Sequence, residues 1–168
     1  MNVDSYAAID IIGFYGPVIL AIITCLSLII QLPYLLLFLI GLFFNSQFNT
    51  VLKSFIKEPR PSNVSKYEGA QQYGMPSGHA QSVFFSLTFL YLVKNSYWLL
   101  LAMLFFSALT LYQRWNTKEH TPKQLLVGSA VGLVSGYAWF KLSKYIISPR
   151  QFKPYNNTGG KESNPAKI

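Results

Sequence analysis

The chain has two histidines, His79 and His120, and each lies at the start of an apolar run. Phosphoryl transfer through a covalent intermediate needs a nucleophile and an acid for the leaving group. Two imidazoles can divide these roles, because an imidazole titrates near neutrality. A single histidine beside a helix start is more often a capping or hydrogen-bonding residue. The pair therefore indicates chemistry only if its neighbours support it.

Three cations are expected at the mouth of the same bundle, namely Lys53, Arg60 and Arg114. A phosphoryl group in transfer spreads negative charge over its equatorial oxygens, and fixed cations stabilise that charge. Arginine supplies a planar fork of donors, whereas lysine supplies a point charge. Taken one at a time, such residues are usually interfacial anchors of membrane helices.

Ser77 and Gly78 directly precede His79, at a point where a helix is expected to begin. The free N–H groups and the positive end of a helix bind anions, and glycine lets the backbone approach a phosphate closely. These residues fall into ordered blocks that are hard to explain as anchors alone. The blocks are Lys53 to Pro61, Pro76 to His79, and Arg114 to His120.

The composition places these blocks in a membrane protein. Of 168 residues, 51% are hydrophobic and only 12% are charged, whereas a soluble domain carries about 25% charged residues. Apolar runs of about 20 residues recur, and each can cross roughly 30 Å of hydrocarbon as a helix. Backbone in lipid must satisfy its own hydrogen bonds, so the runs should be helical. The sequence predicts an all-α, polytopic transmembrane bundle with about five spanning helices.

The expected helices are separated by short polar or proline-containing segments. Thr121 has the chemistry of an N-cap and Pro122 that of a first helical residue. Small residues at Gly128, Gly132 and Gly136 would let the last helix pack closely against a neighbour. The five predicted spans are Ile11 to Ile30, Pro33 to Lys53, Ser77 to Val93, Tyr97 to Tyr112, and Thr121 to Ile147.

Counting these spans predicts where the chemistry lies. The polar loop from Lys57 to Met75 and the segment that carries Arg114 and His120 should share one membrane face with the N-terminus. The domain organisation follows as one membrane domain over residues 1–148, which carries the blocks suited to phosphoryl transfer, and a polar, disordered tail over residues 149–168. The first apolar run lacks a preceding Lys or Arg, so we interpret it as a retained span rather than a signal peptide.

Charge and cysteine content narrow the partners. The formal net charge is +8, and the basic residues lie between apolar runs and in the tail. This placement suits lipid head groups and phosphate, whereas a nucleic-acid partner would predict a basic stripe on a soluble fold. The single cysteine, Cys25, excludes an intrachain disulfide and a cysteine-based metal site. We expect a membrane bilayer and a lipid phosphate or diphosphate as partners, and no nucleic acid.

The blocks Lys-x6-Arg-Pro, Pro-Ser-Gly-His and Arg-x5-His together resemble the signature of the type 2 phosphatidic acid phosphatase superfamily. The residues from Lys57 to Pro61, from Tyr73 to Ser77 with Gln81, and His120-Thr121 with Gln124 to Gly128 resemble its dolichyldiphosphatase branch. That branch hydrolyses polyprenyl diphosphates in the endoplasmic reticulum, with its site facing the lumen.

The resemblance implies a role for each residue. His120 would attack phosphorus and become phosphohistidine, and His79 would protonate the leaving oxygen. Water would then release the phosphate without a metal or other cofactor. The phosphate would be held by five residues, namely Lys53, Arg60, Ser77, Gly78 and Arg114.

Two positions depart from the superfamily pattern. Gln113 stands where a serine is usual, and Gln124 stands where an aspartate usually orients the nucleophilic histidine. A glutamine carbonyl can still accept from the imidazole N–H, so Gln124 keeps the orienting role but not the charge. The alternatives are a weak or inactive protein that binds lipid phosphate on the same scaffold, and part of a channel or transporter.

The lysine-rich tail favours a cytosolic C-terminus, which would place the site on the lumenal or extracytoplasmic side. The sequence leaves open the lipid tail, the choice between diphosphate and monophosphate, and the oligomeric state.

Overall fold

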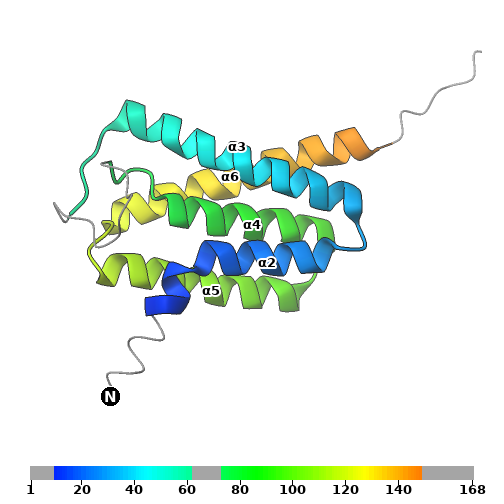
Figure 1. The fold of residues 1–168 in the computed structure, drawn as a ribbon, viewed down its shortest axis with the longest axis horizontal. Coiled ribbons are helices and arrows are strands. Elements are labelled where there is room, and N and C mark those ends of the chain that lie inside the picture. The colour runs from blue at the N-terminus through cyan, green and yellow to red at the C-terminus, as the bar shows by residue number, and fades with distance from the viewer. Residues whose placement is uncertain (1–9, 62–72, 149–168) are drawn as a thin grey trace, which may run out of the picture.

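The computed structural model describes residues 10–61 and 73–148, and within these ranges all the regular elements are helices. The all-α class is therefore confirmed. The helices run roughly side by side along one bundle (Figure 1). They are α2 (Gly16–Leu28), α3 (Leu32–Ile56), α4 (Gly78–Lys94), α5 (Tyr97–Asn116) and α6 (Pro122–Ile147).

Helix α4 is the centre of the bundle and contacts each of the four other labelled helices. It is buried on all sides, so its sequence lacks the one-sided apolar pattern of a surface helix. Aromatic rings form much of the core. The ring centroid of Phe38 of α3 lies 5.5 Å from that of Phe89 and 6.1 Å from that of Phe85, both of α4. A central α4 holds the residues at its N-terminus in a fixed place.

The predicted small-residue face of α6 packs directly on α4. A Cβ atom at Gly128 would lie 2.6 Å from the carbonyl oxygen of Ser77, and one at Gly136 would lie 2.9 Å from that of Phe85. A Cβ at Gly132 would likewise press into the carbonyl oxygen of Gln81. The prediction of close helix packing at these glycines is confirmed. We call this contact line of Gly128, Gly132 and Gly136 with α4 the glycine seam. It also aligns the starts of α4 and α6, where the two histidines lie.

Gly132→Ala is expected to lower the free energy of unfolding by about 1–3 kcal/mol, because the methyl group would press on the backbone carbonyl of Gln81 and on Cβ of Phe84. Unfolding in detergent measures the effect. Val134→Ala is the matched control, since Val134 is 69% exposed on the same helix. Equal stability of Gly132→Ala and wild type would contradict close packing at this seam.

The helix ends explain how the loops reach the site. Thr121 caps α6 as predicted, because its hydroxyl accepts from the Gln124 amide at 3.1 Å while the Gln124 side chain accepts from the Thr121 amide at 3.3 Å. Lys57 ends α3 in the left-handed conformation, with φ of 52°. This residue turns the chain toward Pro59 and Arg60.

The first predicted span is not one continuous helix. Residues 10–14 are helical, Tyr15 forms a turn, and α2 begins at Gly16. Figure 1 shows the short first segment turned away from the axis of α2. Pro17 is the physical reason, because it lacks the N–H that would continue the hydrogen-bond ladder through this point.

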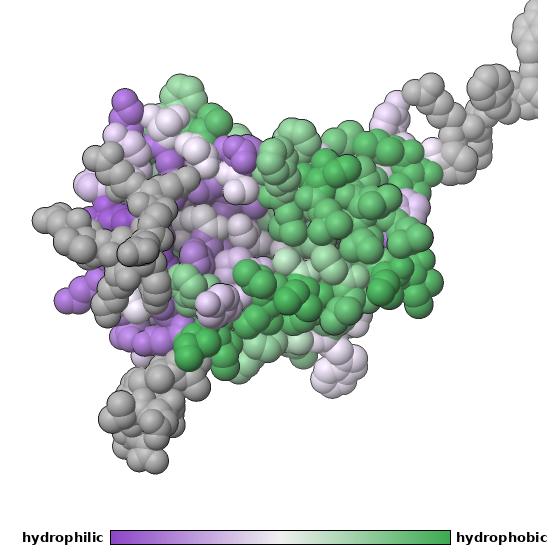
Figure 2. Space-filling view, in the orientation of Figure 1, coloured by the Kyte–Doolittle hydropathy of each residue, from purple (hydrophilic) through white to green (hydrophobic). Residues whose placement is uncertain are grey.

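Polar and apolar surfaces separate along the bundle. Figure 2 shows hydrophilic side chains gathered at the end where α3 stops and α6 starts, and hydrophobic ones over most of the remaining length. Within the described ranges, two helices are long and apolar enough to cross a membrane, α3 and α6, and α2 is a shorter apolar helix. The tail at residues 149–168 and part of the loop, residues 62–72, lie outside the described residues.

Candidate active site

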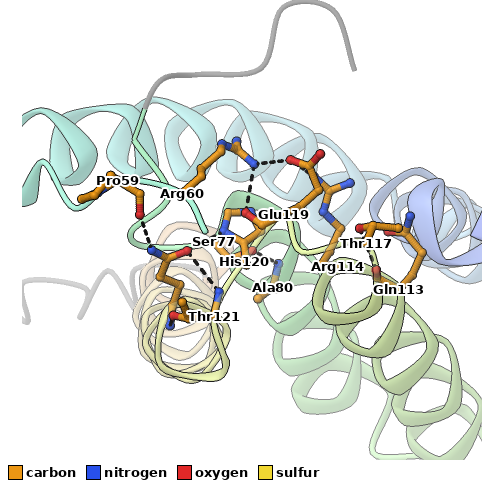
Figure 3. A network of polar contacts seen from close by, with 11 residues as sticks. Pro59, Arg60, Ser77, Ala80, Gln113, Arg114, Thr117, Glu119, His120 and Thr121 are labelled. Carbon is orange, nitrogen blue, oxygen red and sulfur yellow. Dashed lines mark hydrogen bonds and ion pairs between the residues drawn. The ribbon is translucent and has the colours of Figure 1, made fainter. Parts of the chain in front are cut away.

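Three segments that are distant in sequence meet at the polar end of the bundle. The amide of Gly74 donates to the carbonyl of Glu58 at 2.8 Å, and the amide of Ser77 donates to the carbonyl of Gln124 at 3.2 Å. Arg60 reaches the third segment, because its Nη1 donates to the carbonyl of Glu119 at 3.3 Å. These contacts join the blocks of residues that the sequence singled out, and Figure 3 shows the contact between Arg60 and Glu119.

His120 is held by a short relay of side chains. Its Nδ1 lies 3.1 Å from Oε1 of Gln124, and His120 is only 2% exposed. The Nε2 group of Gln124 donates to Oε1 of Glu58 at 3.0 Å and to the carbonyl of Pro59 at 2.8 Å. These acceptors fix the amide with its oxygen toward the ring, so Nδ1 must carry the proton. The Nε2 atom of His120 then keeps its lone pair.

The surroundings keep the His120 ring neutral. They lower its pKa to about 3, chiefly through burial and next through the charge of Arg60, with Arg114 and Lys53 acting in the same direction. The hydrogen bond with Gln124 opposes this shift. The pKa of Glu58 is also lowered, first by its hydrogen bond from Gln124. A neutral imidazole is the nucleophilic form. The ionised carboxylate of Glu58 does not contact this ring directly, because the Gln124 amide lies between the two groups.

This environment predicts a pH dependence of stability. The folded anion-free protein resists protonation of His120, whereas the unfolded chain accepts it near pH 6.5. Below about pH 6.5 the His120 contribution to the free energy of unfolding should therefore fall by up to about 1.4 kcal/mol per pH unit until the folded pKa is reached. Above about pH 6.5 it should be constant.

The measurement is unfolding in detergent across that range, with His120→Asn compared against wild type. The difference between the two curves isolates this residue from the other titrating groups. Parallel curves would contradict the depressed pKa of His120.

Two arginines from different segments converge on one carboxylate oxygen. Oε2 of Glu119 lies 2.7 Å from Nη1 of Arg60 and 3.5 Å from Nη2 of Arg114. The Glu119 side chain is fully buried, and those of Arg60 and Arg114 are 9% and 3% exposed. Figure 3 shows both guanidinium groups directed at this carboxylate, next to His120. The two forks can therefore grip a single small oxyanion.

Lys53 and His79 complete the group of predicted residues. Lys53 lies buried in the last turn of α3. The ring of Phe14 lies 5.7 Å from the His79 ring and 5.9 Å from Cζ of Arg114, so it links the two. The charges of Arg60, Arg114 and Lys53 act on both imidazole rings. The two histidines thus share one electrostatic environment at one end of the bundle.

Ser77 and Gly78 lie where α4 begins, as the sequence predicts. Ser77 is the N-cap, with its hydroxyl oxygen accepting from the Ala80 amide at 3.5 Å. Its own amide is engaged by Gln124, so an anion at this helix start would use the hydroxyl hydrogen of Ser77 and the amides of the first turn.

The residues described from Leu32 onward match a family model. The model of the PAP2 superfamily covers residues 32–148, which is more than half of the chain. The chain belongs to the PAP2 superfamily. The resemblance seen in the three blocks is thereby confirmed.

Curated relatives of this PAP2 chain are lipid phosphatases by name. It is 37% identical over 124 residues to dolichyldiphosphatase 1 of Dictyostelium discoideum, which covers 67% of the chain and 54% of the relative. It is 33% identical over 128 residues to dolichyldiphosphatase 1 of Homo sapiens, with the same coverage. Lipid phosphate phosphatase gamma of Arabidopsis thaliana is 29% identical over 126 residues, or 65% of the chain and 56% of the relative.

The chain spans about half the length of the curated relatives it matches. No solved structure matches it. Along the described part of the PAP2 chain, no group of three or more His, Cys, Asp or Glu residues could hold a metal ion.

Several residues of this PAP2 site escaped the sequence analysis. Glu119 and Glu58 looked like ordinary surface charges, since nothing in their spacing shows what they face. A buried amide network was also missed. Asn49 donates to Oε1 of Gln81 at 2.8 Å and to the carbonyl of Pro76 at 3.2 Å, and Gln81 donates to Oδ1 of Asn45 at 2.9 Å. The four-residue spacing of Asn45, Asn49 and Lys53 inside an apolar helix was the available signal.

Proposed function

We propose that this chain is a metal-independent membrane phosphatase that hydrolyses a lipid diphosphate or lipid monophosphate, with a polyprenyl diphosphate as the first candidate. The convergence of Arg60 and Arg114 on one buried oxygen beside His120 carries the proposal. This arrangement suits a tetrahedral phosphate better than a structural ion pair alone, because a neutral, oriented nucleophile lies at its edge. The names of the relatives indicate the substrate class.

In the first step, Nε2 of His120 attacks phosphorus and the bond from phosphorus to the leaving oxygen breaks. The negative charge of the bound phosphate favours the protonated form of His79, which then donates a proton to that oxygen. Arg60 and Arg114, with Lys53, stabilise the charge on the equatorial oxygens, and Ser77 and the first turn of α4 add hydrogen bonds. In the second step, water attacks the phosphohistidine, His79 accepts a proton from the water, and the bond between phosphorus and nitrogen breaks.

Gln124 and Glu58 support this cycle as a relay. The phosphohistidine ring carries positive charge while Nδ1 stays protonated, and the Gln124 oxygen at 3.1 Å accepts that hydrogen bond. Glu58 polarises the amide from its other side at 3.0 Å. The relay therefore places a negative charge behind the imidazole, one residue further away than a directly bonded aspartate would. This arrangement makes Gln124 compatible with activity.

We also propose that α2 to α6 all cross the bilayer and that the polar end faces the lumen of the endoplasmic reticulum or an extracytoplasmic space. The apolar exposed surface supports this placement, since Leu26 of α2, Phe105 of α5 and Val134 of α6 are all at least 60% exposed. The buried α4 needs less apolar character, because the other helices shield it from lipid. Residues 1–148 would form the phosphatase domain, and residues 149–168 would be a cytosolic tail.

The deciding experiment measures phosphate release from a polyprenyl diphosphate and from a lipid monophosphate in detergent containing a metal chelator. Release that persists with chelator supports the proposal, and the ratio of the two rates identifies the preferred head group. Saturable binding of the lipid without release would instead support a silent lipid-phosphate-binding protein. Release that stops with chelator and returns with added metal would overturn the metal-independent mechanism.

A further inference from the structure

An apolar groove of about 680 Å³ lies between α3 and α6. It is separate from the histidine site, and neither the sequence motifs nor the mechanism uses it. Its walls carry large hydrophobic side chains with little polar surface. The principal wall residues are Phe44, Phe48 and Leu52 of α3, and Val131, Val134 and Leu142 of α6.

One wall of the groove is formed where α3 and α6 meet. The two helices cross part-way along the bundle and diverge from there toward the polar end (Figure 1). The indole of Trp139 packs against Gly41 at this crossing, and its Nε1 donates to the carbonyl of Leu37 at 2.7 Å. A Cβ at position 41 would collide with the indole ring. The tight contact at the crossing therefore gives the groove a fixed wall.

The lining of the groove is mainly apolar. Phe85 of α4 contributes an aromatic surface. The polar lining residues Asn45 and Ser135 are hydrogen-bonded to each other, because the Ser135 hydroxyl donates to Oδ1 of Asn45 at 3.0 Å. The same oxygen accepts from Gln81 at 2.9 Å. With these polar atoms engaged, the groove offers mainly apolar contacts to an occupant.

Along α3, the groove comes within one residue of the phosphate site. Leu52 lines the groove, and the next residue, Lys53, is one of the cations of the site. From Leu52 to Gly41 the helix advances about 16 Å, given a rise of about 1.5 Å per residue. A molecule with its anionic head at His120 could lay an extended hydrocarbon chain along this length.

We propose that the groove between α3 and α6 binds the hydrocarbon chain of the lipid whose phosphate is hydrolysed at His120. The inference rests on the proposed function and deepens it by locating the tail. Lipid tails are as apolar as the groove, so the groove contributes little through hydrophobic transfer and acts mainly by aligning the chain. Its benefit should therefore appear as chain-length dependence of kcat/KM.

Two substitutions block the groove at different depths. Ala130 and Ala138 both line it, and they lie eight residues, or about 12 Å, apart on α6. Ala130 is the nearer to His120. Ala130→Phe should lower kcat/KM about tenfold or more for geranylgeranyl diphosphate and longer chains, with a smaller loss for geranyl diphosphate. Ala138→Phe should affect only chains long enough to reach it. Tail-less para-nitrophenyl phosphate should be hydrolysed as by wild type.

Ala102→Phe is the matched control, because Ala102 is exposed on α5 away from the groove. Equal losses at every chain length, or the same length dependence in Ala102→Phe, would overturn the proposal. A change of oligomeric mass in both groove variants, with no length dependence, would overturn it in favour of a subunit interface.

A labelling experiment separates this proposal from the proposed function. A prenyl diphosphate with a photoactivatable terminal group should label peptides of α3 and α6, and Ala138→Phe should reduce that labelling. Labelling there without any phosphate release would refute the phosphatase but uphold the groove. Release with labelling confined to other helices would uphold the phosphatase and refute the groove.

Discussion

His120→Ala is expected to reduce phosphate release from a lipid diphosphate by at least about 10⁴-fold. The substitution removes the nucleophile and leaves the phosphate-binding groups, such as Arg60, Arg114 and Lys53, without a covalent step to assist. The relay behind the ring has no other function in the first step, so Gln124 and Glu58 cannot compensate. Initial rates at saturating substrate, with chelator present, measure the loss.

Two further measurements make the His120 result specific. When wild-type protein is incubated with a radioactive lipid diphosphate and quenched, radioactive phosphate should stay bound to the protein and should be released by acid. His120→Ala should carry no such label. Lys123→Ala is a neighbouring control, because Lys123 is exposed and pairs with Glu58 at 3.2 Å rather than with the ring. It should retain most of the activity. A His120→Ala protein that folds as wild type and keeps a tenth of the rate would refute the covalent mechanism.

Glu119→Ala is expected to destabilise the anion-free protein and to strengthen the binding of inorganic phosphate. Breaking a buried ion pair by removing one partner costs about 3–5 kcal/mol, because the charge left behind stays buried. Here Arg60 and Arg114 would both lose the Glu119 carboxylate that lies between them. A bound phosphate would restore that neutralisation and would no longer compete with the carboxylate for the two forks.

The Glu119 prediction needs stability and affinity together. Without phosphate, Glu119→Ala should unfold at a lower temperature than wild type. Added phosphate should raise the unfolding temperature of the variant more than that of wild type. The inhibition constants of phosphate and orthovanadate should fall about tenfold. Glu119→Gln serves as the second variant should the alanine protein fail to fold.

Asp10→Asn controls for net charge, since it removes the same charge from the N-terminal helical stretch. A purely structural Glu119 would lower stability equally with and without phosphate and leave both inhibition constants unchanged. That result would refute competition between the carboxylate and the substrate phosphate.

Much of the fold was predictable because its signals are local. The polar turn at Lys94 to Ser96 separates α4 from α5 as expected, and Thr121 with Pro122 starts α6. The glycine seam could be predicted from a four-residue spacing on one helix. The break at Tyr15 was missed because the apolar run continues through it. Pro17 was the available signal, but proline is also common in the first turn of a helix.

The roles of the site residues stay predictions. The contacts that bring these residues together join positions far apart in the sequence. The Glu58–Gln124 hydrogen bond joins positions 66 apart in sequence, and the Arg60–Glu119 pair joins positions 59 apart. No periodicity relates such positions. Carboxylates at span ends also have an ordinary interpretation as solvated charges, so Glu58 and Glu119 could not be singled out.

The sequence by itself determined the residue types available for phosphoryl transfer, the helical class, and the sharing of one end by the motif blocks. These follow from short-range chemistry and from the number of chain reversals. Only the tertiary structure decided that a buried carboxylate joins the two arginines, that an amide relay sets the protonated nitrogen of His120, and that α3 and α6 diverge into a groove. These features depend on the angles at which helices pack, and such angles arise from side-chain contacts across the whole bundle.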